Sequence, residues 1–344
     1  MKPATIPPHE LAVERIEERW VVEEGRPRLL ELRAEGGRTR LTPGDPAFRA
    51  ESIPFFPRSD SFGGAGDRIF SALLDALPPA ARFHVRRVAI FRTAIPEDGG
   101  ILRDATSFCT MKGAGGTLVM RLSVDAPDLL FESLDLLESG GDGVRPDPHA
   151  LPLAWLRGTG AVLFHEALGH PAEAGAPRLK WPPWLRVVDD PSHEGLGAME
   201  FDDTGRRIAA ADLTRGACPM AARRESYRDE PLVRMTNVVV STAGAPFPPL
   251  PDPRLEALLL GGGRWDPVTD LVSIRVIRAR RVVAGIASTA APFTWRAPRT
   301  RIPSLLVGGG GPLLAYPGVA CGDEGQRIPV GSFAPAIVTE ALPR

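Results

Sequence analysis

The chain has 344 residues, of which 43% are hydrophobic, and a formal net charge of −1. It can therefore bury substantial cores, and its charge gives no general reason to expect nucleic acid or an anionic membrane as a partner. The length exceeds the size at which single cores stop growing, so we predict two domains, at residues 1–150 and 151–344. No uninterrupted apolar segment approaches the ~20 residues of a membrane span, and the N-terminus shows no secretory signal.

The cysteines indicate the redox compartment. Cys109, Cys218 and Cys321 are too few and too scattered to form a disulfide framework. We therefore expect a reduced, cytoplasmic protein in which one of these thiols is available as a metal ligand.

Hydrophobic periodicity predicts a mixture of helices and strands in the N-terminal domain. In chain order the predicted elements are a short amphipathic helix over 8–19, a pair of short strands within 20–32, a helix over 68–77, strands over 83–91 and 116–124, and a helix over 129–137. Asp67 fits the N-cap of the helix over 68–77, and Pro78 ends that helix. The N-terminal domain is thus predicted to be mixed α/β.

Beyond Pro171, short β-like runs alternate with loops rich in proline and glycine. The runs lie at 185–188, 238–240, 271–277 and 281–286. We therefore predict an α+β fold with a β-rich C-terminal domain of mainly antiparallel sheet. The glycines at 308–311 lack the Lys-Ser/Thr and the following helix of a phosphate-binding loop, so they predict a flexible turn.

The most informative motif is His-Glu-Ala-Leu-Gly-His at residues 165–170. Zinc binds neutral imidazoles, and a hydrolytic zinc site needs a carboxylate that takes a proton from water. Histidines five positions apart point about 140° away from each other on a regular α-helix. They can share one ion only if the helix widens or ends at His170. Gly169 tolerates unusual dihedrals, Pro171 disfavours the α region for His170, and π-bulges recur in functional helices.

A less specific interpretation of the same motif stays open. Two histidines near a helix end can be solvated caps without any metal. The preceding residues 155–164 are nearly uncharged and apolar, which favours burial of a helix that we expect to begin near Pro152. Buried histidines need partners, and only six histidines occur in the chain, so the metal site is the stronger interpretation.

Further segments follow the motif in a characteristic order. They are Val-Val-Asp-Asp at 187–190, Phe-Asp-Asp-Thr-Gly at 201–205, Arg-Arg-Glu-Ser-Tyr at 223–227, Arg-Met-Thr-Asn at 234–237 and Val-Ala-Cys-Gly-Asp-Glu-Gly-Gln at 319–326. Together with the histidine motif they resemble the TldD/PmbA family of metalloproteases, and in particular its TldD branch, which retains His-Glu-x-x-x-His. The resemblance covers about 155–338 and is thinner over 84–124.

This resemblance implies a cytosolic zinc peptidase that hydrolyses unfolded or leader peptides and works as a homodimer or as a heterodimer with a paralogue. By position, His165, His170 and Cys321 match the Zn2+ ligands, and Glu166 matches the glutamate that acts as general base on a zinc-bound water. Arg224 and Tyr227 are candidates for binding the peptide or stabilising the oxyanion, with a solvated surface role as the alternative for both.

The sequence also departs from the family pattern. The N-terminal domain is shortened, the stretch between 203 and 223 is compressed, and Asp229 stands where family members often carry a histidine. These departures favour an alternative function as a non-catalytic peptide-binding or scaffolding subunit of a TldD-like dimer. A serine hydrolase is poorly supported because the chain has no Gly-x-Ser-x-Gly elbow. The aspartates of the matched segments are expected to be turn and cap residues more often than functional acids; they are Asp189, Asp190, Asp202 and Asp203.

Overall fold

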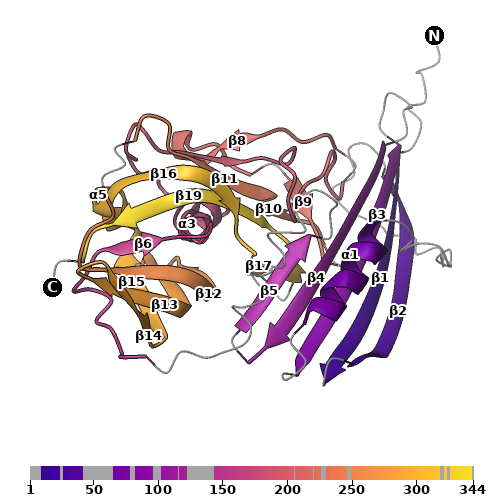
Figure 1. Cartoon of the computed structure of the whole chain (residues 1–344). Helices are drawn as coiled ribbons and strands as arrows, with labels where there is room; N and C mark the ends of the chain where they lie inside the picture. Colours follow the sequence, from indigo (N-terminus) through magenta and orange to yellow (C-terminus); the bar gives the residue numbers. More distant parts are fainter. Residues whose placement is uncertain are drawn as a thin grey trace, which may run out of the picture.

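A computed structural model of the chain contains two large sheets, one built from the N-terminal part and one from the C-terminal part (Figure 1). The structure describes residues 9–23, 26–41, 65–77, 82–95, 102–114, 116–121, 143–204, 206–219, 221–225, 230–245, 249–317, 321–323 and 326–342. The helix predicted over 129–137 lies outside these residues. Within the described ranges, no helix has the length and apolar character needed to cross a membrane.

The N-terminal sheet is antiparallel and has five strands in the order β2-β1-β3-β4-β5. Its strands are β1 (His9–Glu23), β2 (Arg26–Leu41), β3 (Phe83–Ile95), β4 (Leu102–Gly113) and β5 (Gly116–Arg121). The strands predicted over 83–91 and 116–124 are therefore confirmed. The helix predicted over 8–19 is wrong, because β1 pairs with β2 on one edge and with β3 on the other. Ladder bonds to two strands that are distant in sequence override the local periodicity, which is a weak signal by itself.

Helix α1 (Ala65–Ala76) packs on one face of this sheet. Its buried residues Phe70 and Leu73 join an apolar cluster with Phe83 and Met111 of the sheet. The helix predicted over 68–77 is confirmed, but it begins at Ala65, so Asp67 lies inside it and is not the N-cap.

The opposite face of the N-terminal sheet contacts the C-terminal part. Val88 and Phe108 on that face form a small apolar cluster with Leu196. Arg15 of β1 donates a hydrogen bond from Nη1 to the carbonyl oxygen of Glu225, at 2.6 Å. The first sheet ends at Arg121 and the second begins at Leu153, and the predicted boundary at residue 150 stays a prediction.

The C-terminal sheet has ten strands in the order β14-β13-β12-β6-β19-β11-β7-β8, with β15 paired to β13 and β16 paired to β19. The strands are β6 (Leu153–Trp155), β7 (Arg186–Asp189), β8 (Ala211–Asp212), β11 (Asn237–Ser241), β12 (Arg254–Asp266), β13 (Leu271–Val283), β14 (Ile286–Ala290), β15 (Phe293–Pro298), β16 (Leu306–Ala315) and β19 (Gly331–Thr339). Among the described pairs of strands in this sheet, only β6–β12 and β11–β19 are parallel. The predicted α+β class with a mainly antiparallel C-terminal sheet is confirmed.

Smaller elements lie beside this sheet. Two short hairpins join β9 (Ala221–Arg223) to β10 (Leu232–Arg234) and β17 (Cys321–Asp323) to β18 (Gln326–Ile328). The short helical elements are α3 (Gly160–Phe164), η2 (His165–Gly169), α4 (His170–Glu173), η3 (Leu213–Arg215), η4 (Arg299–Arg301) and α5 (Ile302–Leu305).

Two predictions for the C-terminal part are wrong in ways that the packing explains. The motif helix begins at Gly160 and not near Pro152, because Leu153–Trp155 forms β6 between β12 and β19. The glycines at 308–311 lie within β16 and do not form a flexible turn. A Cβ atom added at Gly309 would lie 2.8 Å from the side chain of Ile337 on β19, so a larger residue does not fit there.

The helix that carries the histidines widens between them, which is one of the two outcomes that the sequence predicts. Residues 165–169 form a π turn in which the backbone N–H of His170 bonds the carbonyl of His165. Residues five apart therefore take the stacked positions that residues four apart have in an α-helix. The helix then continues as α4, so it does not end at His170. Pro171 lacks an N–H donor and its ring clashes with the carbonyl four residues earlier, which favours the widened turn.

The roles of Pro171 and Gly169 in the widened turn differ from those expected from the sequence. His170 stays in the α region (φ −59°, ψ −41°), so Pro171 does not push it out. Gly169 is also in the α region (φ −63°), and an added Cβ would lie 1.8 Å from Sδ of the buried Met235. Gly169 is thus required by the close approach of Met235 and not by an unusual dihedral.

Gly169→Ala should lower the free energy of unfolding by about 1–3 kcal/mol, because the new methyl group overpacks against Met235. Met235→Ala removes the side chain that the methyl meets, so the double variant should lose less stability than the sum of the single variants. Urea unfolding of the four proteins measures this coupling. Strictly additive losses would show that Met235 is not what excludes alanine at position 169.

Glu17 on β1 should stabilise the N-terminal sheet in a pH-dependent way. Its carboxylate accepts hydrogen bonds from Arg86 of β3 at 2.7 Å and from Arg19 at 2.9 Å. Burial opposes its ionisation, but these bonds and the arginine charges lower its pKa from 4.5 to about 2. The stabilisation is therefore present above pH 4.5 and is lost as pH falls towards 2.

Glu17→Gln should cost about 1–2 kcal/mol at pH 7, and this cost should shrink as pH falls from 4.5 to about 2. Glu23→Gln on the same strand is the matched control, since Glu23 forms an exposed pair with Arg82 at 2.9 Å. Exposed pairs contribute about 0–1 kcal/mol, so the control should change stability little at any pH. Equal costs for both variants in denaturant unfolding would contradict the prediction.

Candidate metal centre

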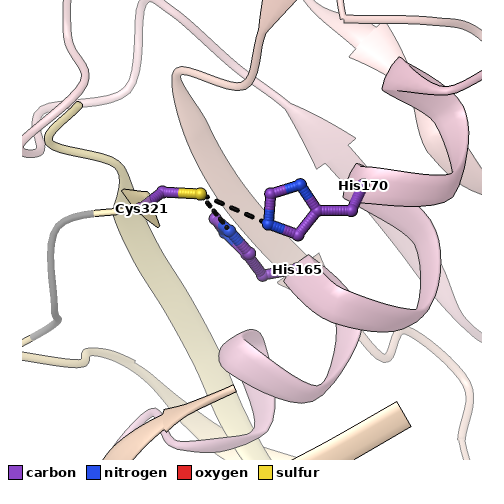
Figure 2. Close-up of side chains that lie close together, drawn as sticks. All are labelled: His165, His170 and Cys321. Atoms are coloured by element: carbon purple, nitrogen blue, oxygen red, sulfur yellow. Dashed lines mark hydrogen bonds between the residues drawn. The ribbon is translucent and has the colours of Figure 1, made fainter. Parts of the chain in front are cut away.

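Three side chains that could bind a metal converge next to the widened helix (Figure 2). Nε2 of His165 and Nε2 of His170 each lie 3.2 Å from Sγ of Cys321. The ligand atoms of the three residues all lie within 4.8 Å of one another. Cys321 begins β17 and is 156 residues from His165 in sequence, so the fold brings together the residues that the sequence matched to the metal ligands.

This arrangement fits a tetrahedral metal. Zinc bonds of about 2.3 Å to sulfur and 2.0–2.1 Å to nitrogen place S and N about 3.5 Å apart in a tetrahedron. The observed separation of 3.2 Å from Sγ to each Nε2 differs from that by a few tenths of an ångström. Two imidazoles and a thiol also form a donor set that zinc prefers, and a fourth position is left open for chemistry.

The electrostatics of the two histidines differ. Burial and the positive charges of His170 and Arg234 hold the pKa of His165 well below its ordinary value, so this imidazole is neutral. Burial by itself would lower the pKa of His170, but hydrogen bonds with Cys321 and Glu173 and the charge of Glu166 raise it to about 11. A pKa this high reflects an excess of negative charge around His170, which a metal cation would balance in place of the proton.

Glu166 faces the same centre without belonging to the group of ligand atoms. Burial raises its pKa from 4.5 to about 7, against the opposing effects of His170 and of a hydrogen bond from the backbone of Trp265. Its Oε2 lies 3.8 Å from Nε2 of His170 and has no hydrogen-bond partner among the described residues. On β12, a Cβ at Gly263 would lie 2.6 Å from Oε1 of Glu166, so the glycine makes room for the carboxylate.

Two further residues hold the ligands and were not identified from the sequence. Oε2 of Glu173 lies 2.7 Å from Nδ1 of His170, and Nη2 of Arg234 lies 2.6 Å from Sγ of Cys321. The signal for Glu173 is its position three residues after His170 on the same helix. Arg234 lies in a matched segment, but nothing in that segment shows that it points at a cysteine 87 residues later.

The remaining candidate residues stand apart from this group. The backbone N–H of Arg224 donates to Oδ2 of Asp203 at 2.8 Å, and its Nη2 donates to the carbonyl of Asp203 at 2.6 Å. The substrate role of Arg224 stays a prediction, while Tyr227 and Asp229 lie outside the described residues. Asp202 receives the backbone N–H groups of residues 204, 206 and 222, which confirms its expected role in a turn.

The other two aspartates also hold backbone. Oδ1 of Asp189 accepts bonds from the backbone and hydroxyl of Thr236, at 2.6 and 2.7 Å. Oδ1 of Asp190 accepts the backbone N–H of Ser192 at 2.9 Å. Asp189 thus fixes the segment that follows Arg234, which indirectly supports the centre.

Comparison with known sequences gives one informative relative, and no family model matches the chain. A protein of Methanothermobacter thermautotrophicus named "Metalloprotease" is 26% identical over 310 residues. That alignment covers 78% of this chain and 65% of the relative, so the chain spans about two thirds of the relative's length.

Solved structures give the fold. TldE from Thermococcus kodakarensis has a TM-score of 0.64 at 13% identity, covering 98% of this chain and 96% of that one. Two structures named for a proposed role as modulators of DNA gyrase also match. The one from Thermotoga maritima has a TM-score of 0.60 at 10% identity, covering 97% and 94% of the two chains. The one from Bacteroides thetaiotaomicron has a TM-score of 0.57 at 12% identity and the same coverage. The chain therefore has the TldE fold, and these likenesses are consistent with the TldD/PmbA family.

Proposed function

We propose that this protein is a zinc-dependent peptidase. The observation that carries the proposal is the convergence of His165, His170 and Cys321 on one buried point with Glu166 beside it. The name of the Methanothermobacter relative supports the same class of reaction. Zinc is the metal of choice because nitrogen and sulfur donors suit it, whereas magnesium and calcium require oxygen ligands.

The chain's own residues would divide the work of hydrolysis. When bound by His165, His170 and Cys321, the metal would supply Lewis acidity that polarises the peptide carbonyl and acidifies water. Glu166 takes the proton of the attacking water at Oε2, which is the oxygen that the protein leaves without a hydrogen bond. The backbone N–H of Trp265 and the space at Gly263 hold this carboxylate in place. Glu166 then returns the proton to the leaving amine.

The substrate and the assembly belong to the same proposal. We propose unfolded or leader peptides as substrates, and a homodimer or a heterodimer with a TldD/PmbA paralogue as the working form, in the cytoplasm. A thiolate ligand is compatible with the reducing cytoplasm, where thiols are kept reduced.

A second candidate function is a non-catalytic subunit that binds peptide or supports an active partner. The observation in its favour is that Asp229 replaces a histidine common in the family, while Arg224 is engaged with Asp203. The buried Glu166 speaks against it, because a scaffold has no chemical need for a carboxylate whose ionisation is opposed by burial.

The purified chain should bind one equivalent of Zn2+, and both His165→Ala and Cys321→Ala should lose it, because each removes one of three protein ligands. Elemental analysis after loading and desalting measures the content. His149→Ala and Cys218→Ala are matched controls, since the structure places neither residue in the ligand group, and both should keep the metal. A metal-free wild type, or full retention by Cys321→Ala, would overturn the assignment of the centre.

Glu166→Gln should retain the metal and lose peptide cleavage by about 10²- to 10⁴-fold, because glutamine keeps the shape but accepts no proton. The loss should fall on kcat with little change in KM. Glu194→Gln, an exposed carboxylate, is the control. Cleavage of an unstructured fluorogenic peptide provides the rates. If Glu166→Gln keeps most of the activity, the base lies elsewhere. If the zinc-loaded wild type is inactive both alone and with a paralogue, the scaffolding function replaces the peptidase.

A further inference from the structure

A permanent positive charge lies against the proposed metal ligands. Arg234, which is 1% exposed, ends β10 and places Nη2 2.6 Å from Sγ of Cys321. A guanidinium so close to a metal repels it, and burying that charge is costly unless it is compensated. The formation of the three-residue strand β10 does not explain why the guanidinium of Arg234 is buried at this place.

The compensation comes from Glu173 on α4. Oε1 of Glu173 lies 3.4 Å from Nε of Arg234 and accepts the backbone N–H of Met235 at 2.8 Å. The other oxygen, Oε2, lies 2.7 Å from Nδ1 of His170. A continuous path thus runs from the sulfur of Cys321 through Arg234 and Glu173 to the ring of His170, on the side away from the shared Nε2–Sγ contact.

We propose that Arg234 and Glu173 are a positioning pair that holds Cys321 and His170 in their ligand geometry and sets the donor strength of the sulfur. Glu173 fixes the ring of His170 so that Nε2 faces the metal. Arg234 holds the sulfur of a hairpin that arrives from far along the chain, and its hydrogen bond withdraws electron density from that sulfur. This inference rests on the proposed zinc site and extends it to residues that touch neither metal nor substrate.

The two residues have separable effects. Loss of the arginine bond should strengthen the sulfur as an electron donor, so the charge-transfer band from sulfur to a bound Co2+ should move to longer wavelength. Loss of the Glu173 carboxylate frees the His170 ring but leaves the sulfur's partner in place, so that band should move little. Both losses should weaken metal binding by about 10- to 100-fold, the usual effect of removing an outer-shell partner, because for Arg234 the lost positioning of the sulfur outweighs the relief of charge repulsion.

The test uses the full chain, stripped of metal and titrated with Co2+, followed by Zn2+ in competition with a chelator. Arg234→Gln should bind about 10- to 100-fold more weakly and shift the band, whereas Arg234→Lys, which keeps a charged donor, should lie nearer the wild type in both. Glu173→Gln should lose affinity with an almost unshifted band. Arg223→Gln is the control for general damage, since Arg223 is equally buried in the neighbouring strand but donates to the carbonyls of Met235 and Pro329.

The outcomes separate this inference from the proposed function. A wild type that takes up no Co2+ or Zn2+ overturns the zinc site and the positioning pair together. A wild type that loads normally, with Arg234→Gln unchanged in affinity and band, overturns the positioning pair alone. Arg223→Gln with the same band shift would also overturn it, because the shift would then report general damage. If circular dichroism shows that Arg234→Gln is unfolded, the metal affinities of Arg234→Lys and Glu173→Gln still test the positioning pair.

Discussion

The centre depends on one geometric constraint, namely that two imidazoles five positions apart must face the same point. A regular α-turn cannot satisfy it, so the helix adds one residue to a single turn. Pro171 favours this turn because it has no backbone N–H to donate and because its ring clashes with the carbonyl four residues earlier. Gly169 lets the turn lie directly against Met235, and Met235 lies in the segment that also supplies Arg234. The widened turn therefore orients the histidines and also packs the helix against the segment that carries Arg234.

Many ionisable groups are concentrated in the buried space around the proposed metal centre. Two histidines, a thiol, an arginine and two acids lie close together there, and all of them are buried or, like His170 and Glu173, partly buried. Such a cluster costs stability in a protein that only has to fold, because each charge must be desolvated. The pKa values of the two histidines are shifted in opposite directions, and burial raises the pKa of Glu166. Groups with strongly perturbed pKa values cluster at functional sites, because the chemistry there requires them despite their cost in stability.

The sequence predicted the local geometry better than the long-range contacts. The spacing of His165 and His170 was sufficient to predict that the helix either widens or ends at His170, because helix geometry is a local property, and the structure shows the widened turn. Cys321 could be matched only through resemblance, since no local rule joins residues 156 apart. The same limit explains the failure at residues 8–19, whose strand is defined by two distant partners, and at 308–311, which lie on a strand paired with β19 and include Gly309 packed against Ile337 of β19. Arg234 was missed because a buried arginine is recognisable only once its partners are in place.

The order of strands in the C-terminal sheet has a consequence for synthesis on the ribosome. β19, at residues 331–339, lies between β6 and β11, so it connects the strands β14-β13-β12-β6 to the strands β11-β7-β8 in the described order. Cys321 emerges only ten residues before β19 begins. A nascent chain therefore exposes the histidine motif long before it has either the bridging strand or the third ligand. The proposed metal centre therefore has its full set of ligands only after residue 321 has been made and β19 has joined the sheet, so a shorter nascent chain cannot hold a metal through all three residues.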